Sequence, residues 1–333
     1  MAFFTAMKFF SRSRLSALRG WGRPRVDGRR FVFLYHRIAS PEHDPFALSV
    51  SASQFQDHLD ILRSHFRMVT LDELLDTRTA KRSILASITF DDGYTDNLTT
   101  ASPILRRAGI PATFFICTGC LGDVRGFWWD RVATAIAAAD IAARALDTLE
   151  LTKEISFTGD LSSPDARRLA TLEIAGRLRS MDVLQRNRIV EELETAVLAR
   201  TSGTWESCPV LDEAGVRELG SQPLAQLGAH THNHPMLSVL TPEEQLAEIN
   251  RSAAILQEIT GTRPRFVAYP YGSQQDYSED SCVAARAAAL DAAFVNHPAP
   301  FDPKRQPYRV PRYYVPPLSA DDFRSWLYRV IDQ

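Results

Sequence analysis

Apolar and polar positions along the chain follow two alternating patterns. Short continuous apolar runs predict buried strands, and longer stretches with apolar residues three or four positions apart predict helices. The runs that predict strands are 31–36, 84–90, 111–116, 224–229, 266–268, 292–296 and 308–315. The stretches that predict helices between them are 53–65, 99–108, 243–260 and 280–290. Continuous apolar strands that alternate with helices are typical of an α/β protein with a parallel sheet.

The segment from about 126 to 205 departs from this alternation. It is rich in Ala, Leu, Arg and Glu, and no strand-like run in it compares with the others. Helices are expected over 133–149 and 166–199, with a break near 158–164. Because the strand–helix pattern resumes at residue 224, we expect a helical insertion in one domain that covers 31–333.

Composition fits a globular protein of this kind. The chain has 333 residues, of which 45% are hydrophobic and 23% are charged. That length suffices for one large barrel-type domain. No run of eighteen apolar residues occurs, so the sequence predicts no membrane-spanning helix.

Charge is unevenly distributed along the chain. Residues 1–30 hold eight Lys and Arg against one acid, whereas the rest has 30 bases and 39 acids. A mildly acidic body argues against a nucleic-acid enzyme, which usually carries a basic stripe.

The N-terminal 30 residues do not read as a secretory signal. The apolar start Ala2-Phe3-Phe4 is short, and Lys8 interrupts it. Two interpretations stay open: a disordered basic tail, or an amphipathic helix that lies on anionic lipid. We therefore expect a cytoplasmic protein, or one in peripheral contact with the membrane through this segment.

Two neighbouring acids give the strongest chemical signal. Asp91 and Asp92 directly follow the apolar run 84–90, and the only histidine cluster, with His230 and His234, follows a later run. Adjacent buried carboxylates repel each other unless a metal or a shared proton relieves them. Carboxylate and imidazole ligands suit one divalent metal. Asp92, His230 and His234 could be its ligands, with Asp91 as the base of a metal-dependent hydrolase. The alternative is that the aspartates cap the following helix.

These motifs resemble those of the polysaccharide deacetylase family, also called the NodB-homology or carbohydrate esterase 4 family. Thr89-Phe90-Asp91-Asp92-Gly93 matches its first motif, and His230-Thr231-His232-Asn233-His234 matches its second. The resemblance covers about residues 31–315 and implies a deformed (β/α) barrel. It also implies removal of acetyl groups from N-acetylated sugars, with Asp92, His230 and His234 on the metal and Asp91 as the base. The chain is most similar to the exopolysaccharide and poly-N-acetylglucosamine deacetylases.

The third motif of the family is altered in this chain. Its usual form is Arg-x-Pro-Tyr-Gly, and here it reads Ala268-Tyr269-Pro270-Tyr271-Gly272. The backbone N–H of Tyr271 could still stabilise an oxyanion. The arginine that steadies the base is absent from its usual place, and Arg312, after a later strand, is the candidate replacement.

Two histidines are candidates for the general acid. Tyr35-His36-Arg37 matches a motif of the exopolysaccharide branch, in which the histidine is the acid, and we favour His36. His297, in Val295-Asn296-His297-Pro298, is the alternative. Trp128 and Trp129 could stack on sugar faces or could anchor the insertion to the barrel.

Together these features predict a metal-dependent N-deacetylase. Its expected cofactor is a divalent metal, Zn²⁺ by preference, and its expected substrate is an N-acetylhexosamine unit of a glycan. The alternatives are an O-acetyl esterase, a deacylase of non-sugar amides, and a catalytically silent carbohydrate-binding protein.

Overall fold

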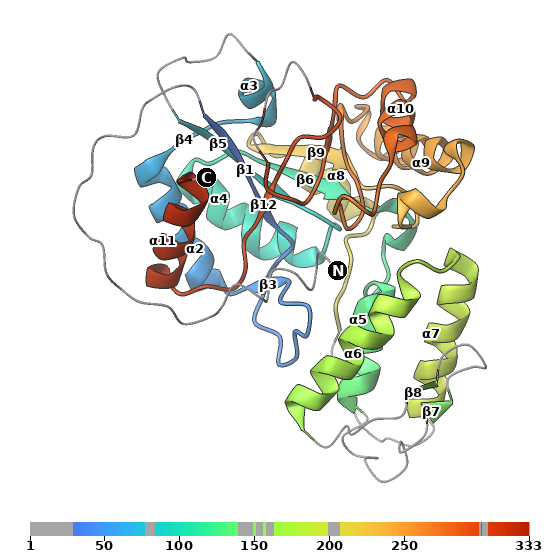
Figure 1. Cartoon of the computed structure of the whole chain (residues 1–333). Coiled ribbons are helices and arrows are strands. Elements are labelled where there is room, and N and C mark those ends of the chain that lie inside the picture. Colours follow the sequence, from blue (N-terminus) through green and yellow to red (C-terminus); the bar gives the residue numbers. More distant parts are fainter. Residues whose placement is uncertain are drawn as a thin grey trace.

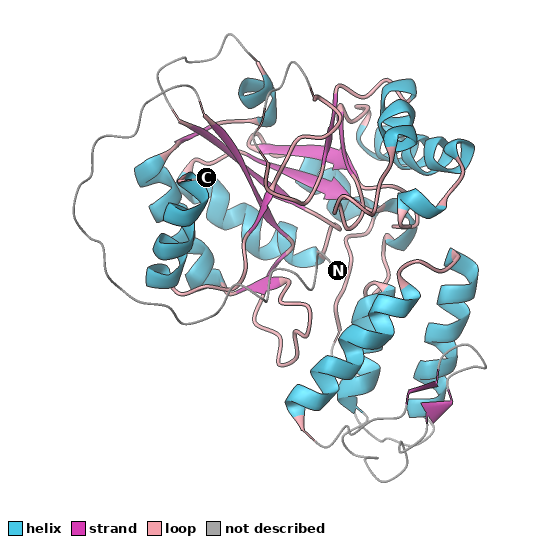
Figure 2. Cartoon of the chain, in the orientation of Figure 1, coloured by secondary structure: helices cyan, strands magenta, loops and turns pink. Residues whose placement is uncertain are grey.

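A curled parallel sheet forms the centre of the molecule. The computed structural model describes residues 29–76, 84–138, 149–150, 156–157, 163–198, 207–299, 301 and 306–332. In it, eight strands form one sheet, with helices around them (Figures 1 and 2). The strands are β1 Arg30–Tyr35, β4 Arg67–Met68, β5 Leu85–Phe90, β6 Ala112–Ile116, β9 Ala225–Ala229, β10 Phe266–Ala268, β11 Ala292–Phe294 and β12 Tyr313–Tyr314. Their order is β11–β10–β9–β6–β5–β1–β12, with β4 beside β5, and every pair is parallel. The predicted α/β fold is confirmed.

One segment near the C-terminus contacts both edges of the sheet. Val310 bridges to Phe294 of β11, while Tyr313 pairs with Phe33 of β1. The single long strand predicted over 308–315 is therefore wrong, because the chain crosses from one edge to the other. Pro311 lies at the crossing, where its missing N–H costs no ladder hydrogen bond.

Helices cover the sheet much as the apolar spacing predicts. The predicted ones are α2 Ala52–His65, α4 Ser102–Ala108, α9 Pro242–Thr260 and α10 Glu279–Ala287. Three further helices are α3 Leu71–Leu75, α8 Glu213–Gly220 and α11 Ala320–Ile331. The cap of α2 is Ser51, whose hydroxyl accepts from Gln54 N and whose N–H donates to the Gln54 side chain. A π-helical turn, Asn97–Ala101, takes the place of the predicted first turn of α4.

Three helices stand together beside the barrel (Figure 1). They are α5 Trp128–Ala138, α6 Pro164–Leu178 and α7 Val183–Leu198, and all lie in the range predicted to be an insertion. The single helix predicted over 166–199 is wrong, because Asp182 accepts hydrogen bonds from Leu184 N and Gln185 N and starts a new helix. A short antiparallel pair, β7 Leu149–Glu150 and β8 Ser156–Phe157, also lies here and was not expected.

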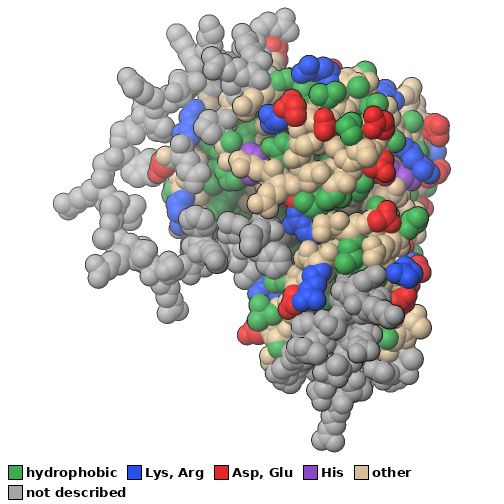
Figure 3. Space-filling model, turned by 45° about the vertical axis from the view of Figure 1, so that its right-hand side comes forward, with side chains coloured by type: hydrophobic (Ala, Val, Ile, Leu, Met, Phe, Trp, Pro, Cys, Tyr) green, Lys and Arg blue, Asp and Glu red, His purple; other side chains and the backbone are tan. Residues whose placement is uncertain are grey.

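The surface carries charges of both signs. On the face that Figure 3 shows, basic and acidic side chains are interspersed. Within the described ranges, no helix has the length and apolar character needed to cross a bilayer. The predictions for the N-terminal 30 residues fall almost wholly outside the described residues, which begin at residue 29.

Candidate metal centre

Three buried side chains converge where β5 and β9 end. Asp92 Oδ1 lies 3.4 Å from His230 Nε2 and 3.4 Å from His234 Nε2. The two imidazole Nε2 atoms are 3.2 Å apart. The three side chains are almost inaccessible to solvent. Each offers one possible ligand atom, and these three atoms lie within 4.8 Å of one another. The structure thus brings together the three residues predicted to bind the metal.

The donor chemistry of this cluster fits a divalent cation. His230 Nδ1 donates to the Ala268 carbonyl at 2.9 Å, which leaves its Nε2 lone pair facing Asp92 and His234. Burial lowers the pKa of His234 to about 4, so this imidazole is neutral near pH 7. Burial also lowers the pKa of His230, but the nearby carboxylates of Asp91 and Asp92 outweigh it and raise the pKa. A positive charge is therefore favoured at the point where the three ligands meet, and one carboxylate with two imidazoles suits zinc.

The backbone is strained at the ligand loops. Asp92, Thr231, His234 and Tyr271 all have positive φ values, of 77°, 61°, 52° and 60°. Residues other than glycine rarely adopt this region, and such strain is concentrated at functional sites. These left-handed turns lie on three loops, after β5, β9 and β10, and Asp92, His234 and Tyr271 of these loops line one cavity.

The histidine loop is held from outside by Glu248 of α9. Its carboxylate accepts from His232 N at 2.9 Å and from Asn233 N at 2.8 Å, and also from the Asn233 side chain. Gly119 closes on the same loop, because a Cβ at this position would lie 2.4 Å from the His232 carbonyl oxygen. Both contacts fix the loop that carries His230 and His234.

Asp91 is paired with Arg312. The guanidinium donates from Nη1 to Asp91 Oδ1 at 2.6 Å and from Nη2 to Oδ2 at 2.7 Å. Arg312 is fully buried, and its Nε donates to the Val295 carbonyl. Burial alone would raise the pKa of Asp91, but Arg312 and His230 outweigh it and hold the pKa below its usual value. Asp91 is thus an oriented, ionised carboxylate 3.9 Å from His230 Nε2. The carboxylates of Asp91 and Asp92 face Arg312 and the two histidines, so neither aspartate caps the following helix.

The two candidate acids lie in different places. His36 lines the same pocket as the ligands, and among the described residues its buried Nδ1 has no hydrogen-bond partner. Asn97 fixes it from behind by donating to the His36 carbonyl at 2.8 Å. Burial lowers the pKa of His36, although Asp91 and Asp92 oppose the shift. His297 does not line the pocket, and its Nε2 lies 3.1 Å from the Tyr277 hydroxyl.

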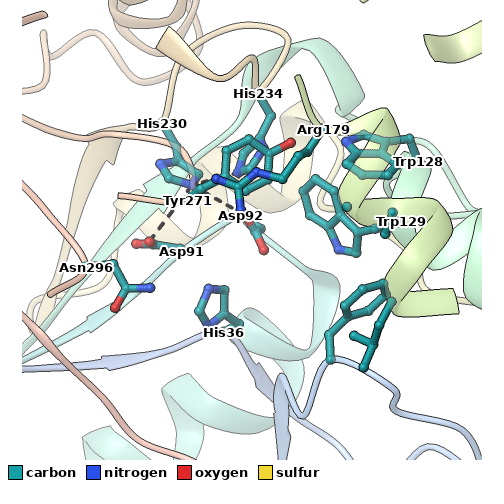
Figure 4. A pocket seen from close by; sticks show the side chains of 14 residues that line it. His36, Asp91, Asp92, Trp128, Trp129, Arg179, His230, His234, Tyr271 and Asn296 are labelled. Atoms are coloured by element: carbon teal, nitrogen blue, oxygen red, sulfur yellow. Dashed lines mark hydrogen bonds and ion pairs between the residues drawn. The ribbon is translucent and has the colours of Figure 1, made fainter. Parts of the chain in front are cut away.

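The pocket itself has a cavity volume of about 50 Å³ (Figure 4). Tyr271 lines it with its ring 4.8 Å from that of His234. Trp128 and Trp129 also line it, yet both are buried: Trp129 stacks on Phe127, and Trp128 packs edge-on against Trp129. The two predicted roles of these tryptophans are therefore compatible: the same rings join the insertion to the barrel and form a wall of the pocket.

Some residues of the site could not be identified from the sequence. Asn296 lines the pocket, and Arg186 of α7 donates to the Asn233 carbonyl at 3.2 Å and to that of His234 at 3.5 Å. Together with Glu248, they resemble ordinary polar residues of loops and helices. Only the folded chain brings them to the ligands.

Comparison with known proteins agrees with this geometry. The sequence profile of the family described as Polysaccharide deacetylase matches residues 78–153 and 181–293. YxkH of Bacillus subtilis is 29% identical over 127 residues, which are 36% of this chain and 43% of that protein. The poly-β-1,6-N-acetyl-D-glucosamine N-deacetylase of Staphylococcus aureus is 38% identical over 96 residues, 27% of this chain and 32% of that enzyme. The matched part thus spans less than half the length of either relative.

A solved structure supports the fold over nearly the whole chain. IcaB from Ammonifex degensii superposes with a TM-score of 0.57 at 19% identity, and the match covers 91% of this chain and 97% of that one. At this identity the likeness concerns the fold, which is a deformed (β/α) barrel. The predicted fold is confirmed in this respect too.

Proposed function

Because the chain belongs to the polysaccharide deacetylase family, we propose that it is a metal-dependent N-deacetylase of a glycan. The reaction adds water across the amide bond of an N-acetylhexosamine unit and gives acetate and a free amine. One observation carries the proposal: the buried Asp92–His230–His234 cluster lies beside Asp91, a carboxylate held in place by Arg312.

The cluster would hold the metal, for which we propose zinc. A divalent ion bound there lowers the pKa of a water molecule and polarises a carbonyl oxygen. The three side chains contribute by their preset arrangement, since His230 is already oriented by the Ala268 carbonyl.

Asp91 serves as the general base in this proposal. Both of its oxygens accept hydrogen bonds from Arg312, so the carboxylate keeps one orientation and stays ionised. It accepts the proton of the attacking water as the bond to the acyl carbon forms. Arg312 is its positioning residue and does not touch the substrate.

His36 and Tyr271 act on the other charges that develop. The Tyr271 backbone N–H donates to the oxyanion. The imidazolium of His36 donates its proton to the departing nitrogen, which leaves as the free amine. Burial lowers the pKa of His36, which makes its imidazolium a stronger acid but leaves a smaller fraction of it protonated at neutral pH.

Poly-N-acetylglucosamine oligomers are the first substrates to test, because the Staphylococcus aureus relative is named for that polymer. Acetate and free amine should appear in equal amounts. O-acetylated sugars and simple acetamides, assayed in parallel, cover the two enzymatic alternatives. Binding of the oligomer without any product would instead favour a silent carbohydrate-binding protein.

A further inference from the structure

Four side chains that donate hydrogen bonds meet on the side of the pocket that faces the helical insertion. Tyr271 and Trp128 line the pocket, and the Tyr271 hydroxyl is turned toward Trp128 (Figure 4). The Arg179 guanidinium lies 4.8 Å from the centre of the Tyr271 ring, and that of Arg186 lies 5.1 Å from the centre of the Trp128 ring. We call Trp128, Arg179, Arg186 and Tyr271 the donor cluster.

Two of these side chains are buried without an acceptor for their protons. Tyr271 is 9% exposed and Trp128 is 6% exposed. Among the described residues, the Tyr271 hydroxyl, Trp128 Nε1 and Arg186 Nε all lack a hydrogen-bond partner. An indole N–H and a guanidinium can only donate, so the other members of the donor cluster cannot accept the proton of the Tyr271 hydroxyl.

The Tyr271 hydroxyl stays a donor at neutral pH. Burial raises its pKa to about 12, although Arg186, Arg179 and Trp128 oppose the shift. A buried donor without an acceptor is unfavourable. The donor cluster therefore favours a ligand that can accept hydrogen bonds.

The charge of the donor cluster favours an acceptor that is an anion. Arg186 is buried, and it donates to the carbonyl oxygens of Asn233 and His234. A carbonyl carries no net charge, so these hydrogen bonds orient the guanidinium but do not neutralise it. Because a buried cation without a counter-charge is unfavourable, an anion held nearby would stabilise the folded protein.

Carboxylates of the protein around the pocket are already engaged. Asp276 pairs with Arg179, and Asp91 pairs with Arg312. Asp92 faces the two imidazoles of the metal site. The anion that the donor cluster favours must therefore come from a ligand.

We propose that the donor cluster is a subsite for one carboxylate group of a ligand. Tyr271 and Trp128 donate to its oxygens, and the two guanidinium groups supply the compensating charge. The Tyr271 ring is 4.8 Å from that of His234, so the subsite lies directly beside the metal ligands. An acidic sugar of the glycan is therefore the expected source of the carboxylate. This source rests on the proposed function, whereas the binding of a carboxylate does not.

Calorimetric titration with D-glucuronate, and with D-glucose as its uncharged counterpart, tests the subsite without any turnover. The full-length, zinc-loaded protein should bind glucuronate saturably and glucose about tenfold more weakly or less. Tyr271→Phe, which removes one donor and keeps the ring, should weaken glucuronate binding by about tenfold, and so should Trp128→Phe. Repeating the titrations after treatment with a chelator separates the donor cluster from the metal, since the difference between wild type and Tyr271→Phe should persist.

A matched control is Tyr277→Phe. The Tyr277 hydroxyl lies 3.1 Å from His297 Nε2, outside the pocket, so its removal should leave the affinity for glucuronate unchanged. Glucuronate binding that is no tighter than that of glucose would overturn the subsite. Equal affinities of the wild type, Tyr271→Phe and Trp128→Phe for glucuronate would overturn it as well.

A second set of assays identifies the source of the carboxylate. N-acetylglucosamine oligomers that are oxidised to the carboxylate at C6 are compared with their methyl esters. A kcat/KM that is about tenfold higher for the carboxylate, and that loses this advantage in Tyr271→Phe, supports an acidic sugar of the substrate. Equal kcat/KM values, with glucuronate still bound, would instead assign the subsite to a free carboxylate. If glucuronate binds as expected and no oligomer releases acetate, the proposed function alone is contradicted.

Discussion

Arg312 and Asp91 form a buried ion pair between residues 221 positions apart in the sequence. Such a pair is costly to break from one side, because the partner is left as an uncompensated buried charge. The cost is typically about 3–5 kcal/mol. If Arg312 is removed, the buried charge left without a partner is the carboxylate of Asp91, which we propose as the base.

Replacing Arg312 by Met should therefore affect catalysis and stability together. We expect kcat to fall by about 100-fold or more, since Asp91 loses its orientation and its pKa rises. The free energy of unfolding should drop by about 3 kcal/mol, while metal content stays near that of the wild type. Arg312→Lys keeps the charge but not the paired hydrogen bonds. Its kcat and its free energy of unfolding should therefore lie between those of the wild type and of Arg312→Met. Full activity in Arg312→Met would refute the positioning role.

The two candidate acids give a second prediction at this scale. His36→Ala should lower kcat by about 10²–10⁴-fold, the usual contribution of a general acid. His297→Ala should change kcat little, because His297 is bonded to Tyr277 outside the pocket. Steady-state kinetics of both variants on one oligomer decide between them. A larger loss in His297→Ala would reverse the assignment.

How far the sequence predicts the site depends on the residue. Asp91 and Asp92 directly follow a buried strand, which predicts their position at a strand end. The spacing of His230 and His234 is typical of metal ligands. Both the position and the chemistry of these residues can therefore be predicted from the sequence. Arg312 can be nominated only as a cation after a strand. Glu248 and Asn296 carry no such mark, because their importance comes from backbone N–H groups and a cavity that form on folding.

At the scale of elements, α2 buries a histidine, His58, among its apolar residues. His58 Nε2 donates to the Leu318 carbonyl at 2.9 Å, and the ring stacks on Phe323 at 3.9 Å. Apolar residues set the helical stripe, and His58 lies on it one turn from Leu62. Burial lowers the pKa of His58 to about 4.

This histidine should make the fold weaker in acid. The folded pKa is below the ordinary 6.5, so the unfolded chain binds more protons between about pH 4 and 6.5. His58 therefore lowers stability as the pH falls through this window, by up to about 3 kcal/mol, and has no such effect above it. Urea unfolding at a series of pH values should show a flatter profile for His58→Gln. His65→Gln, on the same helix, serves as control, and identical profiles for wild type and His58→Gln would contradict the account.

The helices beside the barrel are tied to the ligand loop through α7. Arg186 donates to the carbonyls of Asn233 and His234, and its guanidinium lies 5.1 Å from the centre of the Trp128 ring. Partners of this kind orient ligands and tune their affinity for metal.

Removing this attachment should weaken metal binding. We expect Arg186→Met to reduce zinc affinity by about tenfold, as measured by competition with a chromogenic chelator. Arg177, exposed on α6 and paired with Glu173, provides a control, and Arg177→Met should leave the affinity unchanged. Equal affinities for wild type and Arg186→Met would show that α7 does not act on the ligand loop.

Element boundaries were predictable where the apolar pattern is local. The strands β5 and β10 and the helix α9 differ from their predicted ranges by at most one residue at each end. The division of 166–199 into two helices was not visible, because it depends on the cap that Asp182 forms. α11 was missed, although its buried residues Phe323, Leu327 and Val330 have the spacing of an amphipathic helix.

At the scale of the whole molecule, closure of the sheet creates the site. The crossing segment joins β11 to β1, and Arg312 lies on it between Val310 and Tyr313. Alternating strands and helices predict a parallel sheet, and strand ends predict one catalytic edge. The closure of the sheet through the crossing segment could not be predicted. It depends on the contacts of Val310 with Phe294 and of Tyr313 with Phe33, which join segments far apart in the sequence.

The central claim is that Asp91 acts beside a metal held by Asp92, His230 and His234. Its most direct measurement is acetate release from N-acetylglucosamine oligomers by the wild type and by Asp91→Asn, each with and without a chelator. The wild type should release acetate, lose this activity with the chelator and regain it with added zinc. Asp91→Asn should bind zinc, but its rate of acetate release should be lower than that of the wild type by about 100-fold or more. Release that survives the chelator, or full activity in Asp91→Asn, would contradict the account.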